Sequence, residues 1–179
     1  MSTDASAERK KARQQYLAKL LAPHGVTLTH LAPGAQAALH EYARFILVSG
    51  DAGSADWGAP IIHLCKAVEC ELIAMLDGIP GLEDLERIGI GQMGRALQAK
   101  TSDLRSALSR RGLPATYILD VLPELLLRLA EIRRKSQSAH GSKSPRKATR
   151  ADHDKALNIA VHQEAVIPTL ASHRARARR

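Results

Sequence analysis

The chain has 179 residues, which is enough for one domain with a sizeable core and gives little reason to expect a second domain. Hydrophobic residues make up 45% of the sequence but aromatic residues only 3%, so the core must consist of Leu, Ile, Val and Ala, which favours packed helices over a β-sandwich. No apolar run approaches the ~18 residues that cross a bilayer, and residues 1–16 lack the apolar stretch of a signal peptide. These features predict a cytoplasmic protein that does not engage a membrane.

The net charge of +8 is concentrated in the last quarter of the sequence. From Arg133 onward there are twelve Lys and Arg against three acidic residues, whereas the preceding 132 residues carry fourteen against fifteen. A clustered cationic surface attracts phosphate polymers over roughly a Debye length. A solvated, unstructured basic loop and tail would have the same composition, so both interpretations stay open at this point.

The first third of the chain predicts two helices joined by a connector. Residues 8–22 place leucines on one stripe and cations on the other, and Pro23 and Gly25 end this helix. Residues 26–34 form a connector, and residues 35–48 form the second helix. Its inward-facing side chains are predicted to be Leu39, Tyr42, Phe45 and Ile46.

A strongly apolar helix is predicted over residues 60–76, after a loop at residues 50–60. Lys66 and Glu71 fall away from its apolar stripe, whereas Glu69 lies nearer to it and can hydrogen-bond to a neighbouring helix. Because Glu69 and Glu71 are two residues apart, they cannot share a helix face as a catalytic pair.

Two short helices and one long apolar helix follow. The short helices are predicted at residues 89–99 and 101–112, and the long one at residues 115–135. Pro123 is easiest to place in the first turn of a helix capped by Asp120.

The last part of the chain predicts a basic loop, a helix and a tail. Residues 141–150 are polar and basic, and residues 150–171 form a final helix in which Pro168 produces a kink. The fold class is therefore all-α, a single-domain bundle of six to seven helices. The predicted divisions are an N-terminal helix within residues 1–25, the bundle over residues 35–171, and a disordered basic tail over residues 172–179.

The segment Gly89–Gly94 satisfies the G-x-G-x-x-G pattern of a dinucleotide-binding loop. That function requires a preceding buried strand, so that the glycines and a helix N-terminus approach a pyrophosphate. The preceding residues, GLEDLERI, are acidic and do not have the pattern of a strand. We therefore interpret the segment as the turn that enters a helix.

The histidines and cysteines do not form a recognisable metal or catalytic motif. H-E-x-x-H and C-x-x-C are both absent from the sequence, and His63 and Cys65 are better explained as packed side chains than as metal ligands. Cys65 and Cys70 lie about 140° apart on one helix, so they cannot bridge each other and are predicted to be buried, reduced thiols. We predict no metal and no cofactor.

The end of the long apolar helix combines cations with a histidine. Arg133, Arg134 and Lys135 are followed by His140, and both residue types can reach one phosphate if the helix ends near Lys135. Metal-independent RNA cleavage needs a base for the 2′-hydroxyl and a cation against the charge that develops on the phosphate. Cations also stabilise a helix C-terminus through its dipole, which explains them without any function.

Three short motifs in a fixed order resemble bacterial members of the HEPN superfamily, small helical domains that include metal-independent ribonucleases. They are Ala-Val-Glu-Cys-Glu-Leu at 67–72, Ile-Gly-Gln-Met at 90–93, and an Arg/His element in which Arg134 or Arg133 precedes His140. In a tighter register Lys135 stands where the family has Arg, and Lys lacks the planar guanidinium fork.

The resemblance implies a helical bundle that pairs two-fold and brings two Arg/His elements to one cleft. By this resemblance the protein engages RNA, and Arg134, Arg133 and His140 carry endoribonuclease activity in a toxin or defence system. Further RNA contacts are expected from the basic residues around them, Lys135, Lys143, Arg146, Lys147 and Arg150.

Two other functions remain open. One is a non-catalytic helical module that binds nucleic acid or a partner protein through its basic C-terminal region. The other is a helical subunit whose basic tail only aids solubility.

Overall fold

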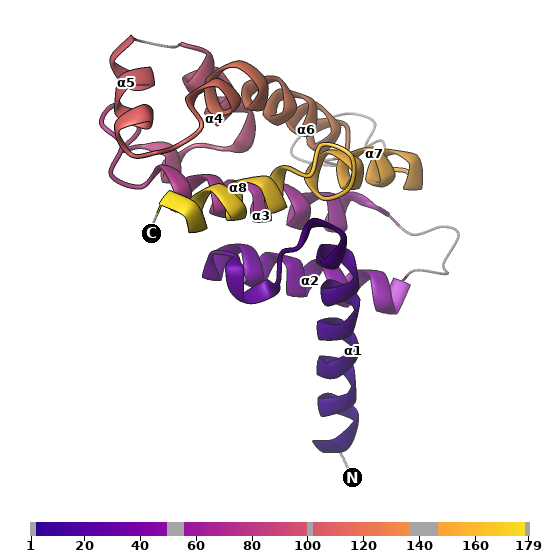
Figure 1. Ribbon diagram of the computed structural model, residues 1–179. Helices are drawn as coiled ribbons and strands as arrows, with labels where there is room; N and C mark the ends of the chain where they lie inside the picture. Colours follow the sequence, from indigo (N-terminus) through magenta and orange to yellow (C-terminus); the bar gives the residue numbers. More distant parts are fainter. Residues whose placement is uncertain (1–2, 50–55, 100–101, 137–146, 178–179) are drawn as a thin grey trace.

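The computed structural model describes residues 3–49, 56–99, 102–136 and 147–177. Within these ranges the chain forms no strand and eight α-helices, which are α1 (Thr3–Leu21), α2 (Pro33–Ser49), α3 (Gly58–Leu76), α4 (Ile90–Gln98), α5 (Ser102–Arg110), α6 (Leu122–Ser136), α7 (Arg150–Ala160) and α8 (Val166–Ala177) (Figure 1). The predicted all-α class is confirmed, with one helix more than expected. None of these helices is both long and apolar enough to span a bilayer.

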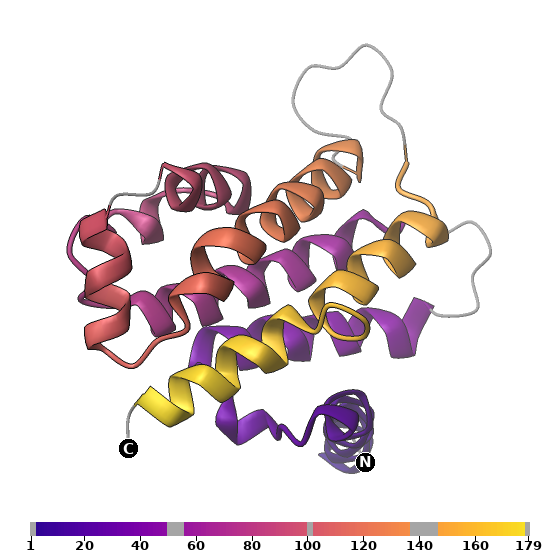
Figure 2. The same cartoon turned by 45° about the horizontal axis from the view of Figure 1, so that its top comes forward.

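Helix α3 is the centre of the bundle. It packs against α2, α4, α6, α7 and α8, and Figure 2 shows it running between them. Glu71 was predicted to face away from the core, but it is fully buried. The prediction was wrong because it assumed one buried stripe, whereas α3 is covered on several sides. Lys66, on the remaining side, is exposed as expected.

Helices α4 and α6 approach each other at two glycines. A Cβ atom on Gly91 would lie 3.0 Å from Ala130, and one on Gly94 would lie 3.0 Å from the carbonyl oxygen of Pro123. The two glycines are three residues apart and therefore share one face of α4. Gly89 is the N-cap of α4. The glycine pattern thus forms a helix-entry turn, as the sequence predicted, and it also permits the close packing of α4 on α6.

The start of α6 differs from the prediction. A π-helical turn, Tyr117–Val121, leads directly into α6, so Asp120 lies inside helical structure and does not cap a helix start. Pro123 explains this turn, because it has no backbone N–H and its ring crowds the carbonyl four residues earlier. The wider turn, closed by a bond from the Leu122 N–H to the Tyr117 carbonyl, accommodates the proline.

The segment predicted as one final helix is divided into α7 and α8. The break lies between Ala160 and Val166, and it includes Ala165 at a positive φ of 47°. Pro168 was expected to kink the helix, but it lies in the first turn of α8, where its missing N–H costs little. The break therefore precedes the proline.

The basic tail predicted to be disordered from residue 172 is helical as far as Ala177. Arg174 explains this difference, because its side chain turns into the core. Its Nε donates to Glu71 Oε2 at 3.2 Å, and its NH2 donates to the carbonyl oxygen of His30 at 2.6 Å. These contacts attach the last turns of α8 to the bundle.

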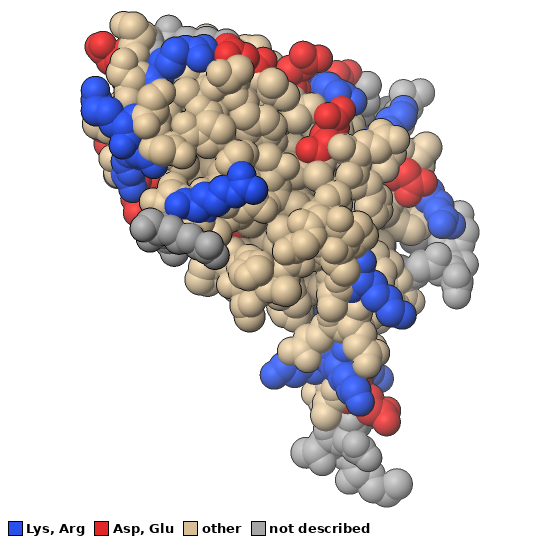
Figure 3. Space-filling model, in the orientation of Figure 1, with Lys and Arg blue, Asp and Glu red and all other residues tan. Residues whose placement is uncertain are grey.

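Helix α1 begins at Thr3, earlier than predicted, and extends away from the bundle in Figure 1. Only its last turns are packed, through the buried side chains of Leu17, Leu20 and Leu21. Residues 6–15 are exposed apart from a partly buried Arg13. Figure 3 shows Lys and Arg side chains on this projecting part.

Candidate nucleic-acid interface

A shallow groove of about 260 Å³ lies between the beginning of α4 and the end of α6. Its lining residues are Gly89, Ile90, Gly91, Gln92, Arg95, Ala130, Arg133 and Arg134. Gly91 and Ala130, where the two helices approach closely, both line this groove. Two helices distant in sequence therefore line one hollow with three arginine residues.

The beginning of α4 adds positive potential to the groove. The first N–H groups of a helix lack intrahelical partners, and the helix dipole places partial positive charge at this end. Two of the N–H groups here already have acceptors: the Ile90 N–H donates to Glu69 Oε1 at 3.0 Å, and the Gly89 N–H donates to the Gln92 side chain at 3.2 Å. The contribution of α4 is therefore mainly electrostatic.

Glu69 holds Arg133 at the edge of the groove. Arg133 NH1 lies 2.9 Å from Glu69 Oε1, and the two side chains are 28% and 7% exposed. Lys66 Nζ lies 3.6 Å from the other carboxylate oxygen. The expectation that Glu69 would hydrogen-bond to a neighbouring helix is confirmed. One carboxylate on α3 thus fixes both the start of α4 and a guanidinium group of α6.

The groove keeps an excess of positive charge after this pairing. Arg95 and Arg134 are exposed. Among the described residues that line the groove, Arg95, Arg133 and Arg134 are basic and none is acidic, while Glu69 pairs with Arg133 and Lys66 beside it. Guanidinium groups make bidentate contacts with phosphate, so the arrangement suits an anionic ligand.

The structure brings together two of the predicted site residues, Arg133 and Arg134. Helix α6 ends at Ser136, close to the end that the sequence predicted. The side chains of the other predicted residues of this region lie outside the described part of the chain, and they are Lys135, His140, Lys143 and Arg146. The predicted Arg/His pairing therefore stays a prediction.

The two remaining predicted nucleic-acid contacts, Lys147 and Arg150, are both exposed, but neither lines the groove. Arg150 begins α7, and its guanidinium carbon lies 5.8 Å from the ring centre of the buried Trp57. That distance is typical of a cation–π contact. Arg150 thus has a packing role next to the tryptophan.

Sequence reasoning missed Arg95, which lines the groove, and Lys66, which pairs with Glu69. Arg95 directly follows the glycine motif, so its position after a helix-entry turn was the available signal. Lys66 stands three residues before Glu69, a spacing that permits an ion pair on one helix. Neither signal shows that α6 will supply the other half of the groove, because that depends on tertiary packing.

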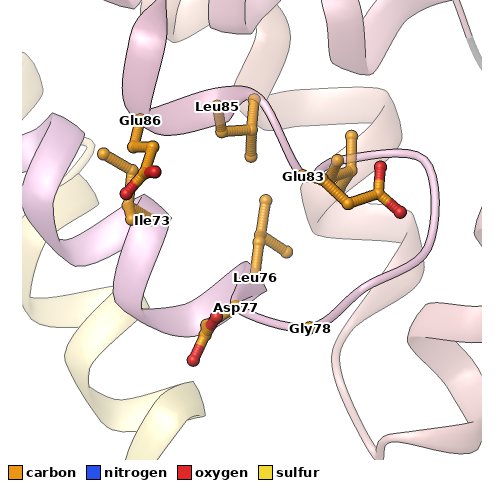
Figure 4. Close-up of a pocket in the computed structure, with 8 residues that line it drawn as sticks. Ile73, Leu76, Asp77, Gly78, Glu83, Leu85 and Glu86 are labelled. Atoms are coloured by element: carbon orange, nitrogen blue, oxygen red, sulfur yellow. The ribbon is translucent and has the colours of Figure 1, made fainter.

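A second hollow, of about 140 Å³, has the opposite charge. It lies between the end of α3 and the segment that follows it, with Leu76 and Leu85 pointing toward one another inside it (Figure 4). The carboxyl groups of Asp77, Glu83 and Glu86 lie around it. Because these carboxylates repel phosphate, the groove between α4 and α6 is the better candidate for an anionic ligand.

The cysteines and histidines of the described residues form no metal site, since no group of three potential ligands occurs among them. Both cysteines are free. Cys65 is buried, which raises the pKa of its thiol to about 12 and keeps it protonated. Cys70 is only half-buried, so the prediction of two buried thiols is correct for Cys65 alone.

Three comparisons with known proteins found no match for this chain. No family model matches the sequence, and no curated protein or solved structure shows significant similarity.

Proposed function

We propose that the protein binds RNA through the groove between α4 and α6, with Arg95, Arg133 and Arg134 contacting phosphate. The observation that carries the proposal is the convergence of these three arginines from two helices beside the positive end of α4. Half or more of the contacts in nucleic-acid complexes go to phosphate and sugar, so such a surface supports binding without base specificity.

The ion pair with Glu69 divides the arginines into two kinds. Arg133 has a fixed geometry and can present only the part of its guanidinium group that faces away from the carboxylate. Arg134 and Arg95 are exposed and can adjust to a ligand. In this proposal Arg133 positions a phosphate, while the other two arginines supply most of the attraction.

The HEPN resemblance extends the proposal from binding to cleavage. In that case His140 acts as general base or acid on the RNA 2′-hydroxyl, and Arg134 with Arg133 stabilises the charge that develops on the phosphate. His140 follows the last residue of α6, Ser136, by four residues and lies outside the described part of the chain, so its role rests on the resemblance. The same resemblance proposes a homodimer in which two such elements face one cleft.

The second candidate is a module that binds nucleic acid without cutting it. The pairing of Arg133 with Glu69 favours this candidate, because part of its charge is already neutralised. Toxin and defence functions belong to the catalytic proposal alone.

Binding is tested with fluorescein-labelled single-stranded RNA by anisotropy, at several salt concentrations. We expect the double variant Arg95→Gln/Arg134→Gln to lower the affinity and to reduce the slope of log K against log salt by about 0.7 per lost contact. The matched control is Arg44→Gln/Lys155→Gln, which removes two exposed cations outside the groove. Equal losses of RNA affinity in both variants would show that only the net charge of the protein matters and would contradict a binding site in the groove.

Cleavage is tested with a mixed RNA pool in EDTA, comparing the natural protein with His140→Ala. Metal-independent cleavage that the variant loses would support the nuclease and its site together. Intact RNA in both samples, with salt-dependent binding, would favour the non-catalytic module. The molar mass in solution, from light scattering, tests the proposed dimer.

A further inference from the structure

The projecting part of α1 is unusual because it has tertiary contacts only at its base. Its side chains from Ser6 to Gln15 are exposed, with Arg13 partly so. The whole helix of 19 residues is about 28 Å long, so roughly half of that length stands clear of the bundle. A helix of this kind gains little from packing, and isolated segments of ~12 residues are marginal in water.

The composition of this segment excludes two common kinds of partner. Between Ser6 and Gln15 there is no apolar side chain larger than alanine. A coiled coil needs apolar residues at a and d positions, so pairing with a second copy of α1 has no basis here. A helix that lies in a membrane interface needs a wide apolar face, which is equally absent.

The charges of the segment have a definite arrangement. The projecting segment carries one acidic residue, Glu8, and four basic residues, which are Arg9, Lys10, Lys11 and Arg13. At about 100° per residue, Arg9, Lys10 and Arg13 fall within one 100° arc, on the side of the helix that carries Leu17. The face that packs against the bundle at the base of α1 therefore continues outward as a cationic face.

We infer that this cationic face of α1 is a second binding surface for the phosphate backbone of the same RNA. Charge complementarity selects this partner, since three cations on one face and Lys11 on the adjoining side, in a segment without an apolar face, match a polyanion and little else. The inference rests on the proposed function for the identity of the ligand, and it adds that the binding footprint extends beyond the groove. It follows that a long RNA binds more tightly than one that fills the groove alone.

The test compares a labelled 8-nucleotide RNA with a 30-nucleotide RNA, using the full chain. In the α1 variant Arg9, Lys10, Lys11 and Arg13 are all changed to Gln. The charge-matched control changes four scattered, exposed cations of the bundle, Arg44, Arg87, Arg128 and Lys155, to Gln. Circular dichroism verifies that both variants remain helical.

We expect the α1 variant to bind the long RNA at least about tenfold more weakly, with the salt slope reduced by about 2 to 3, and to bind the short RNA like the natural protein. The control variant should retain the natural preference for the long RNA. Natural affinity of the α1 variant for both RNAs would overturn the inference, as would an equal loss in the control variant.

The groove variant Arg95→Gln/Arg134→Gln separates this inference from the proposed function. If the groove variant binds both RNAs with natural affinity while the α1 variant binds the long RNA more weakly, the groove proposal is wrong and the inference about α1 is supported. If the natural protein binds neither RNA but the four α1 cations are required for binding to phosphatidylglycerol vesicles, the inference is overturned in favour of a membrane surface.

Discussion

Glu69 and Glu71 lie two residues apart on α3, and each pairs with an arginine from a distant helix, yet the two pairs have different roles. The Glu71–Arg174 pair is almost sealed from solvent, with the side chains 0% and 11% exposed. In the Glu69–Arg133 pair the arginine is 28% exposed and lies at the edge of the groove. The same chemistry thus fastens the core in one place and presents a cation to solvent in the other.

The inner pair is expected to give the largest effect when broken. Glu71 also accepts the backbone N–H of Ala32, so Glu71→Ala leaves the buried Arg174 without its carboxylate partner and the Ala32 N–H without an acceptor. Loss of one partner of a buried pair costs about 3–5 kcal/mol, which we expect in the free energy of unfolding measured in urea. The double variant Glu71→Leu/Arg174→Met should recover part of that loss. A single-variant loss below about 1 kcal/mol would show that the pair is not buried in solution.

Changing the packing between α4 and α6 tests the close approach of the two helices that line the groove. In Gly94→Ala the new methyl group meets the Pro123 carbonyl, and overpacking of this kind costs about 1–3 kcal/mol. Gly89→Ala is the comparison variant, because nothing lies within 4 Å of its Cβ position and its cost is limited to the weaker N-cap preference of alanine. We expect Gly94→Ala to lower the urea midpoint more than Gly89→Ala does. A smaller loss in Gly94→Ala than in Gly89→Ala would contradict the close approach of α4 to α6.

The outer pair is expected to affect stability less and ligand binding more. Glu69→Gln keeps the size of the side chain and an acceptor for the Ile90 N–H, but it removes one negative charge from the groove. We expect a loss of stability of about 1 kcal/mol and an RNA affinity that rises about threefold at low salt. Anisotropy measures the affinity, with Glu41→Gln as the control for net charge. Weaker binding would mean that Arg133 requires its carboxylate in order to contact RNA.

Substitution of His153 is expected to have the smallest effect on stability, and it tests a third buried contact. Its Nε2 lies 3.1 Å from the Tyr42 hydroxyl and its Nδ1 lies 3.1 Å from Asp154, while Arg150 is nearby in sequence. Burial lowers the pKa of His153 although Asp154 opposes this shift. The unfolded chain therefore binds the proton more readily, so the stability from neutral His153 is complete above about pH 6.5 and declines as the pH falls toward the folded-state pKa. His153→Gln should weaken the dependence of the urea midpoint on pH between pH 7 and pH 5. An unchanged pH dependence would contradict the role of His153 in it.

The sequence predicted the fold class and most helix positions because helical periodicity and helix-ending residues are local signals. It failed at Glu71, because a helix covered on several sides has only a narrow solvent face, and at Arg174, because an arginine near the end of a basic chain has the composition of a tail. The groove was predicted only in part. Arg133 and Arg134 stand out in the sequence, whereas Arg95 joins them only through the packing of α4 on α6. The resemblance to HEPN domains, with His140 as its key residue, stays a prediction.

The π turn at Tyr117–Val121 sets the rotational phase of everything that follows it in α6. Each residue of a helix turns the next by about 100°, so a chain shortened by one residue in this turn would rotate Arg133 by that angle relative to the segment before Leu122. Arg133 would then face away from Glu69 on α3. The single extra residue in this turn therefore rotates α6 so that Arg133, near its end, faces the carboxylate of Glu69 on α3.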